Sequence, residues 1–173
     1  MKVKFLILYS WWVRSITFFL PEIPFFQSFR GWLYSIGMKR CGKRFRVSFN
    51  VVINHLESLD VDDNVYLACG TVITGAGNIA IGTNVLIGPN VIIASSKHLY
   101  DGSSFLAGYS HGDVIIEQGC WIGGNATILL GSHIHEASVV AAGSVCNEDY
   151  LRSHLLIAGM PAKAIKQLNF EEK

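Results

Sequence analysis

Six histidines are the side chains of this 173-residue chain that are best suited to acid–base chemistry. The ordinary pKa of imidazole is about 6.5, so a well-placed histidine can accept a proton near neutral pH and typically accelerates a reaction about 10²–10⁴-fold. The six are His55, His98, His111, His133, His135 and His154. Only His98 stands where a regular repeat gives way to a long irregular segment, which can place a side chain in a cleft. His98 is therefore the candidate general base, and His111 in the same segment is a candidate for substrate binding.

The remaining metal-binding and nucleophilic residue types show no pattern typical of a site. The cysteines lack a C-x-x-C pair and zinc-ligand spacing, which favours reduced structural thiols in a cytoplasmic protein. They are Cys41, Cys69, Cys120 and Cys146. His133 and His135 alternate around one corner of the repeat and are interpreted as surface residues, so no metal site is expected.

The repeat has a period of six residues, and it must position these side chains. An aliphatic residue recurs through Ile116, Ile122, Ile128, Ile134 and Val140, and a small residue follows each by four positions. Earlier registers run through Ile81, Ile87 and Ile93, through Val61, Leu67 and Ile73, and through Val47, Ile53 and Leu59. Neither a helix of period 3.6 nor a strand of period 2 requires a strict six. Three short strands per turn of a parallel β-helix do require it.

The repeat also divides the chain. It is lost between about 97 and 113, a stretch rich in glycine and serine, which predicts a loop extruded from the coil. We expect a β-helix over residues 41–160 and a short C-terminal helix with a tail over 161–173. Net charge is +1 with 16% charged residues, which excludes the electrostatic footprint of a nucleic-acid-binding protein.

Residues 1–40 are apolar and aromatic, and they predict a helical segment of a different kind. The runs Phe5 to Val13 and Ile16 to Leu20 are separated by Arg14, and each is too short to span a bilayer. No small-residue cleavage site follows, so a signal peptide is not expected. The segment either caps the open end of the β-helix or packs on a neighbouring subunit, or it rests on a membrane surface beside basic residues near position 40. These readings are compatible.

With these features in hand, the chain resembles the left-handed β-helix, or hexapeptide-repeat, acyltransferases. The likeness covers residues 61–166 and is strongest to the galactoside, maltose and capsular-polysaccharide O-acetyltransferases. It is carried by the segment 81–91 (IGTNVLIGPNV), His98, the segment 121–124 (WIGG), the segment 142–145 (AGSV) and the segment 158–163 (AGMPAK). The resemblance implies a homotrimer with each active site between neighbouring coils, and acetyl-CoA as the acetyl donor.

The resemblance also implies roles for individual residues. His98 matches the catalytic histidine, and the amide of Gly124 matches the group that contacts the thioester, where an oxyanion donor is worth a few kcal/mol. Ala142 and Asn147 match positions along the pantetheine arm. Lys163 and Lys166, three apart on the expected C-terminal helix, match basic positions that meet the nucleotide end of the cofactor.

The acceptor half of the site matches less well. Trp121 and Tyr66 align with residues that flank the acceptor pocket, and Asp101 could orient His98 or bind the acceptor. However, Ala68 stands where galactoside- and maltose-type enzymes have an asparagine, and their charged loop residues after the histidine are absent. The family roles can therefore be assigned more completely to the residues of the donor site than to those of the acceptor site.

The sequence thus predicts a cytoplasmic acetyl-CoA-dependent O-acetyltransferase of a sugar or polysaccharide precursor, acting by direct transfer, with contact to the inner membrane face through the N-terminus. Alternatives are O- or N-acetylation of another small acceptor (an amino sugar nucleotide, serine or an antibiotic) and a noncatalytic β-helix scaffold. β-Helix carbonic anhydrases require two zinc histidines spaced five apart, and no histidine pair here has that spacing.

Overall fold

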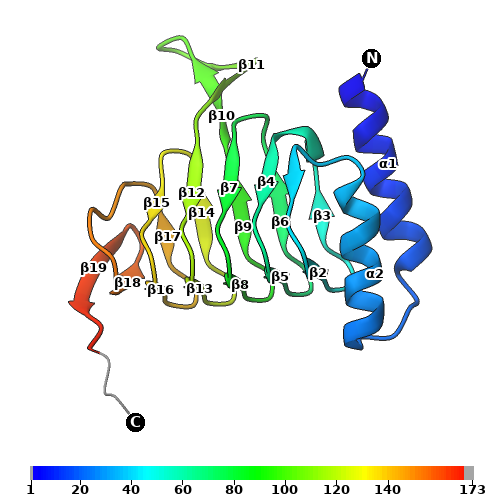
Figure 1. Cartoon of the computed structure of the whole chain (residues 1–173). Helices are drawn as coiled ribbons and strands as arrows, with labels where there is room; N and C mark the ends of the chain where they lie inside the picture. Colours follow the sequence, from blue (N-terminus) through cyan, green and yellow to red (C-terminus); the bar gives the residue numbers. More distant parts are fainter. Residues whose placement is uncertain (1, 170–173) are drawn as a thin grey trace.

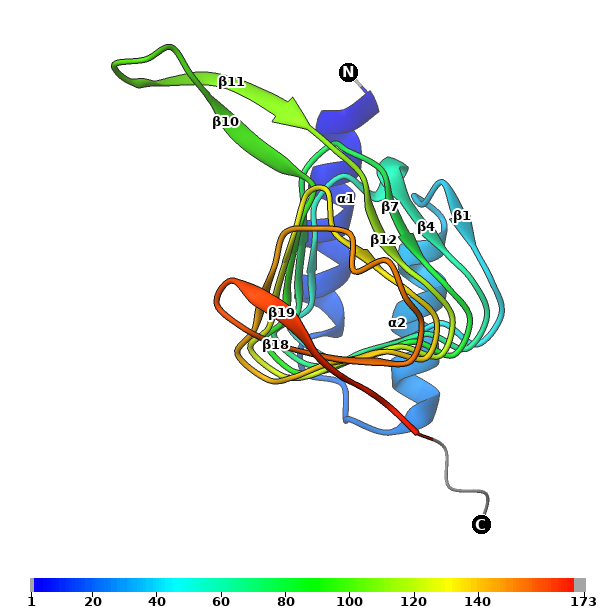
Figure 2. The same cartoon turned by 90° about the vertical axis from the view of Figure 1, so that its left-hand side faces the viewer.

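One aliphatic side chain per hexad points into the molecule, and this winds the chain into a triangular coil. The computed structural model describes residues 2–169 and shows stacked turns of short strands with two helices at the N-terminal end (Figure 1). Viewed along the coil from its C-terminal end, the turns superimpose as a three-sided prism (Figure 2).

Each side of the prism is a parallel sheet that takes one strand from each turn. Sheet A contains β1 (Arg40–Cys41), β4 (Leu59–Val61), β7 (Ile79–Ile81), β12 (Val114–Ile116) and β15 (His133–Ile134). Sheet B contains β2 (Arg46–Val47), β5 (Tyr66–Leu67), β8 (Leu86–Ile87), β13 (Trp121–Ile122), β16 (Val139–Val140), β18 (Leu155–Gly159) and the antiparallel β19 (Ala162–Gln167). Sheet C contains β3 (Val52–Ile53), β6 (Val72–Thr74), β9 (Ile92–Ala94), β14 (Thr127–Leu129) and β17 (Val145–Cys146).

The register of these strands stacks the inward aliphatic residues into ladders. Ile87 pairs with Ile122, and Ile122 pairs with Val140, all in sheet B. The three side chains are at most 1% exposed. Full burial of one such side chain contributes roughly 1.5–3 kcal/mol. The core is therefore one continuous apolar column, as the hexads predict.

Small or left-handed residues turn the chain at the corners. The five small residues that follow the hexad aliphatics are all buried: Cys120, Ala126, Ser132, Ser138 and Ser144. Asn84 and Asn125 adopt positive φ angles of 61° and 59° at their turns. Asparagine tolerates this backbone region better than most residues, so it can occupy a corner that would strain a branched residue.

Two helices cover the N-terminal end of the prism. Helix α1 (Lys2–Thr17) buries Leu6, Ser10, Val13 and Thr17, which lie on one face at helical spacing. Helix α2 (Pro24–Ser35) packs on β2, and its Tyr34 hydroxyl donates to the Val51 carbonyl at 3.1 Å. A single 3₁₀ turn (Leu56–Ser58) lies beside α1. Within residues 2–169 no helix is long and apolar enough to cross a bilayer.

A buried cation ties the two helices together. Arg30 is only 1% exposed, and it pairs with Glu22 at 2.6 Å while donating to the carbonyl oxygens of Leu20 and Thr17. Glu22 also accepts hydrogen bonds from the Ser48 hydroxyl and the Phe49 amide of the first turn. The link between α1 and α2 is thereby fixed to the β-helix.

The structure differs from expectation at two places. The extruded segment is not an irregular loop but an antiparallel hairpin of β10 (Ser96–Tyr100) and β11 (Phe105–His111), which projects from the prism (Figure 1). The expected C-terminal helix is wrong for its described part, because Ala162–Gln167 form β19 and pair with β18. The edge of β18 offers backbone partners that outweigh local helix propensity. Residues 170–173 of the expected tail lie outside the described residues.

Candidate functional site

The three edges of the prism carry different side chains. The chain passes from sheet B to sheet C, then from C to A, and then from A to B in each turn. We call these the B–C edge, the C–A edge and the A–B edge. The histidine hairpin leaves at the C–A edge, and the glycine pair Gly123–Gly124 turns at the B–C edge.

A cavity of about 470 Å³ lies at the root of the hairpin on the C–A edge. Its lining joins the hairpin to the neighbouring turns: His55, Thr74, Gly75, Ala76, Ser96, Lys97, His98, Tyr109 and His111. The predicted base His98 and the predicted binding residue His111 thus lie in one hollow. Four of these residues are held together by the hairpin register, in which Ser96 faces His111 and His98 faces Tyr109.

His98 is held in an orientation that suits a base. Its Nδ1 atom lies 3.3 Å from the carbonyl oxygen of Leu106, and its ring packs on Tyr109 with centroids 4.5 Å apart. A carbonyl oxygen can only accept a hydrogen bond, so this contact selects the tautomer in which Nδ1 carries the proton. Nε2 then keeps a free lone pair, and the side chain is exposed to incoming substrate.

His111 and His55 flank this base. Nδ1 of His111 lies 2.8 Å from the Ser96 hydroxyl, and Nδ1 of His55 lies 3.0 Å from a Glu57 carboxylate oxygen. Sequence reasoning gave His55 no role. Counting turns along the repeat could have identified His55. It stands at the same corner of the coil as Gly75, one turn later, and Ser96, two turns later.

Asp101 has a structural role in the hairpin. Its carboxylate accepts hydrogen bonds from the amides of Ser104 and Ser103 and from the Ser103 hydroxyl, at 2.8–3.0 Å. These bonds lower the pKa of Asp101 to about 2. The carboxylate therefore closes the tip of the hairpin, while His98 is oriented by Leu106 instead.

The B–C edge brings Gly124 close to the turn before it. A Cβ atom at Gly88 would lie 2.7 Å from the Gly124 amide nitrogen, so glycine at position 88 keeps the space beside this amide open. Among residues 2–169 no acceptor takes a hydrogen bond from the Gly124 amide. This amide is therefore free to donate to a developing negative charge.

The other residues predicted for the cofactor lie only partly on this edge. Ala142 lies one turn above Gly123, and the adjacent Gly143 amide donates to the Gly124 carbonyl at 3.0 Å. Asn147 is exposed just past β17, where the chain leaves sheet C, so it lies at the C–A edge instead. Lys163 and Lys166 lie on exposed β19, where Lys163 pairs with Glu148 at 2.9 Å. β19 keeps Lys163 near the B–C edge, where it pairs with Ala158, but carries Lys166 back across sheet B to pair with Leu156. The helical argument for a shared face therefore does not hold.

Trp121 and Tyr66 lie on the outer face of sheet B. Tyr66 pairs with Leu86, and Leu86 pairs with Trp121, so the three form an outward ladder. Trp121 is 54% exposed, and Arg46 lies over the Tyr66 ring at 5.3 Å. Both residues belong to the face next to the B–C edge. Within one chain they are on a different side of the prism from His98.

Sheet C separates the two halves of the predicted site. His98 follows β9 at one edge of this sheet, whereas Gly124 precedes β14 at the other. One chain therefore does not bring the candidate base and the candidate amide donor together.

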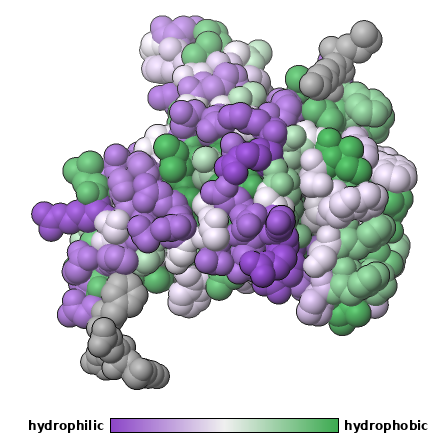
Figure 3. Space-filling view, in the orientation of Figure 1, coloured by the Kyte–Doolittle hydropathy of each residue, from purple (hydrophilic) through white to green (hydrophobic). Residues whose placement is uncertain are grey.

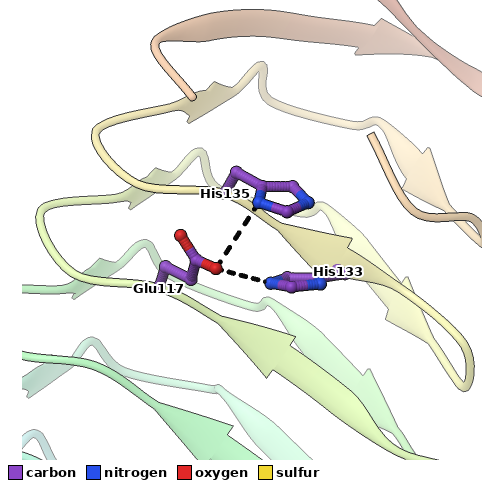
Figure 4. A group of neighbouring side chains, drawn as sticks. All are labelled: Glu117, His133 and His135. Atoms are coloured by element: carbon purple, nitrogen blue, oxygen red, sulfur yellow. Dashed lines mark hydrogen bonds and ion pairs between the residues drawn. The ribbon is translucent and has the colours of Figure 1, made fainter. Parts of the chain in front are cut away.

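A second group of titratable side chains lies toward the A–B edge. Glu117, His133 and His135 offer ligand atoms that all lie within 4.8 Å of one another (Figure 4). The two imidazole rings stack with centroids 3.8 Å apart. The sequence interpretation of these histidines as plain surface residues missed this group, because Glu117 reaches His135 only when one full turn of eighteen residues is counted.

The carboxylate in this group is held in its ionised form. Burial raises the pKa of Glu117, but hydrogen bonds from the Glu136 amide and His133 and the charge of His135 together lower it below the ordinary value. Hydrogen bonds within the protein thus hold Glu117, His133 and His135 in place.

Comparison with known proteins supports the fold. No family model matches the chain. A "putative acetyltransferase" of Saccharomyces cerevisiae is 33% identical over 129 residues, which are 74% of this chain and 65% of that protein. One of the same name from Dictyostelium discoideum is 31% identical, over 73% of this chain and 67% of its own length. A "putative lipopolysaccharide biosynthesis O-acetyl transferase" of Escherichia coli is 31% identical, over 70% and 64%. The chain thus spans about two thirds of these relatives.

Two solved structures share the architecture. A hexapeptide-repeat acetyltransferase of Vibrio cholerae, complexed with acetyl-CoA, has a TM-score of 0.83 at 25% identity, covering 96% of this chain and 89% of that one. A maltose O-acetyltransferase of Clostridium difficile has a TM-score of 0.81 at 23% identity, covering 96% and 90%. The expected left-handed parallel β-helix is confirmed.

Proposed function

Because this chain belongs to the hexapeptide-repeat acyltransferases of the left-handed β-helix fold, we propose that it is an acetyl-CoA-dependent O-acetyltransferase acting on a hydroxyl of a sugar or polysaccharide precursor. The observation that carries the proposal is the orientation of His98. Its Nδ1 is committed to the Leu106 carbonyl, and the exposed ring lines a cavity, which leaves Nε2 to act as the base.

The B–C edge fits the acetyl donor. Its space beside the Gly124 amide would be filled by a Cβ at Gly88. The exposed Lys163 pairs with Ala158 near the end of β18 that reaches this edge. A thioester carbonyl placed there would accept a hydrogen bond from Gly124 as its oxygen becomes negative. Lys163 and Lys166 would meet phosphate groups, with Lys163 exchanging Glu148 for a more highly charged partner.

The reaction then needs few steps from the protein. Nε2 of His98 removes the proton of the acceptor hydroxyl as the new carbon–oxygen bond forms. The Gly124 amide stabilises the oxyanion, the carbon–sulfur bond breaks, and the proton on His98 passes to the departing thiolate. No acyl-enzyme is required, and the acceptor and donor bind together.

Two copies of the chain would complete one site. His98 and Gly124 lie at opposite edges of sheet C, so a second copy must place its B–C edge against the hairpin of the first. We therefore propose a homotrimer in which the hairpin of each protomer reaches its neighbour. Trp121 and Tyr66, beside the B–C edge, would then border the acceptor together with His111 and Tyr109.

The charge distribution supports contact with an anionic membrane. Residues 1–56 contain nine lysines and arginines and one acidic residue, whereas the rest of the chain contains five basic and twelve acidic residues. Basic residues next to a membrane contribute roughly 1 kcal/mol each against anionic lipid. The N-terminal end would therefore be drawn toward the inner face of the cytoplasmic membrane and the opposite end repelled.

The same end exposes aromatic residues that suit the lipid interface. Although α1 and α2 cover the core, ten of their large apolar side chains or immediate neighbours are 39–90% exposed. They are Phe5, Leu8, Trp11, Trp12, Ile16, Phe19, Phe25, Phe29, Trp32 and Ile36. Figure 3 shows this apolar surface gathered over the helical end. Such a surface flanked by cations is typical of an interfacial anchor, and it would present the site to a lipid-linked glycan.

Calorimetric titration with acetyl-CoA, at low and moderate salt, tests the donor site first. We expect saturable binding near one molecule per chain that weakens with salt, because phosphate contacts are screened. Absence of binding by a folded trimer would overturn the proposal. An acceptor screen with the wild type and His98→Ala then tests the chemistry.

A further inference from the structure

We infer that Glu117, His133 and His135 form a binding site for a divalent transition-metal cation such as zinc. The three residues come from two successive turns of sheet A. β12 pairs with β15 so that Ile115 faces His133 and Ile116 faces Ile134, which places Glu117 beside His135. The site lies toward the A–B edge and is independent of the proposed acetyl-transfer site.

Fixed contacts orient two of the three ligands, Glu117 and His135. The Glu136 amide donates to Oε2 of Glu117 at 2.9 Å, which turns Oε1 toward the histidines. Asp149 accepts the Leu151 amide at 2.9 Å and lies 2.7 Å from Nε2 of His135. A carboxylate behind a histidine in this way is the usual outer-sphere support of a metal ligand.

A metal ion can take the place of a proton between His135 and Glu117. Nδ1 of His135 lies 3.4 Å from Oε1 of Glu117. With Nε2 donating to Asp149, loss of the Nδ1 proton leaves a lone pair directed at this carboxylate oxygen, and a cation can bind between the two acceptors. His133 adds a third atom, since its Nε2 lies 2.7 Å from the same Oε1.

The spacing of these atoms matches a metal coordination sphere. Ligands about 2.0–2.2 Å from zinc are separated by roughly 3.4 Å at a tetrahedral angle and roughly 3.0 Å at a right angle. The observed separations of 2.7 and 3.4 Å bracket these values. Two imidazoles and one carboxylate are a zinc ligand set that leaves a fourth position open. Binding would displace the proton shared by His133 and Glu117 into solvent.

The cation would add a further link between turns that are joined by backbone ladders, the apolar core and side-chain hydrogen bonds. Glu117 belongs to one turn and His133 and His135 to the next, and Asp149 bridges to the turn above. The expected consequence is a more stable C-terminal half of the prism in the presence of the metal, without a role in acetyl transfer.

The test titrates the metal-free, full-length protein with zinc against a chromophoric chelator, and with cobalt(II) followed by its visible absorption. We expect one ion per chain, a raised Tm, and affinity lowered at least about 100-fold in His135→Ala and Glu117→Gln. Asp149→Asn should weaken binding about 10–100-fold because it only positions His135.

The matched control is His55→Ala, which removes a histidine that also pairs with a carboxylate, Glu57, at 3.0 Å. It should leave zinc affinity unchanged. Circular dichroism and acetyl-CoA binding establish that each variant is folded. If a variant of a ligand residue does not fold, the zinc affinity of Asp149→Asn tests the site instead. No stoichiometric binding, or binding that survives all three substitutions, would overturn the proposal and show that a proton on His135 fills this place.

Discussion

The imidazole of His98 packs on the ring of Tyr109 directly across the hairpin, with centroids 4.5 Å apart. Together with the Leu106 carbonyl at Nδ1, this contact leaves only Nε2 available to take a proton. The hairpin therefore orients the base, and the β-helix needs only to hold the hairpin at its C–A edge.

Replacement of His98 by alanine should lower kcat about 10²–10⁴-fold, as expected for loss of a general base. The affinity for acetyl-CoA should stay close to that of the wild type, because the proposed donor contacts are made by the Gly124 amide and the C-terminal lysines and not by His98. His111→Ala should mainly raise KM for the acceptor. Steady-state kinetics check both variants, and near wild-type kcat in His98→Ala would refute the catalytic role.

Replacement of Gly88 by alanine should weaken acetyl-CoA binding, because the new Cβ would lie 2.7 Å from the Gly124 amide nitrogen. Gly82→Ala is the matched control, since its Cβ would lie 2.6 Å from the Gln118 amide nitrogen at the A–B edge. Both variants should lose similar stability, and only Gly88→Ala should lose donor affinity by calorimetry. Equal affinities in the two variants would argue against a donor site at the B–C edge.

Replacement of Glu22 by glutamine should destabilise the fold by about 2–4 kcal/mol, because it leaves the buried charge of Arg30 without its partner. Burial raises the pKa of Glu22, but hydrogen bonds from Ser48, Gln27 and Phe49 and the charge of Arg30 lower it overall. The corresponding stability is present at neutral pH and is lost as pH falls through the folded pKa. Urea unfolding at neutral and acidic pH measures both effects, and a loss below about 0.5 kcal/mol would contradict them.

Alkaline pH should destabilise the chain through its buried thiols. Burial raises the pKa of Cys120 and of Cys146 to about 11. A raised folded pKa means that the stability is complete below the unfolded value near 9 and is lost as pH rises toward 11. Cys120→Ala should therefore show a smaller fall in Tm between about pH 8 and pH 10.5 than the wild type, and an unchanged fall would exclude this thiol as the cause.

Exposed aromatic residues of the helical end should bind anionic vesicles. Phe19 and Phe25 are 90% and 71% exposed, so Phe19→Ser with Phe25→Ser should reduce co-flotation with anionic liposomes several-fold. Phe105→Ser, which removes a 75% exposed phenylalanine from the hairpin, is the control. Neutral liposomes should bind the wild type weakly. Equal recovery of all three proteins would argue against the membrane surface.

The hexads determined the β-helix from the sequence alone. Ile116, Ile122 and Ile128 each lie in a different sheet with the same inward direction, so a local period of six is enough to specify a turn. The break in that period likewise located the extruded segment, although it predicted a loop, and Gly124 was singled out by the family resemblance. These features depend only on residues that are close together in the sequence, so the sequence alone reveals them.

Only the tertiary structure revealed the features that depend on contacts between different turns of the coil. Ala162–Gln167 form a strand because they pair with the open edge of β18, and no local sequence pattern reveals that edge. Glu117 meets His135 because eighteen residues make one turn, and His55 enters the cavity of His98 through an insertion at a corner. The separation of His98 from Gly124 by sheet C likewise depends on the closed prism, because only its three sides show which edge each corner of the chain reaches.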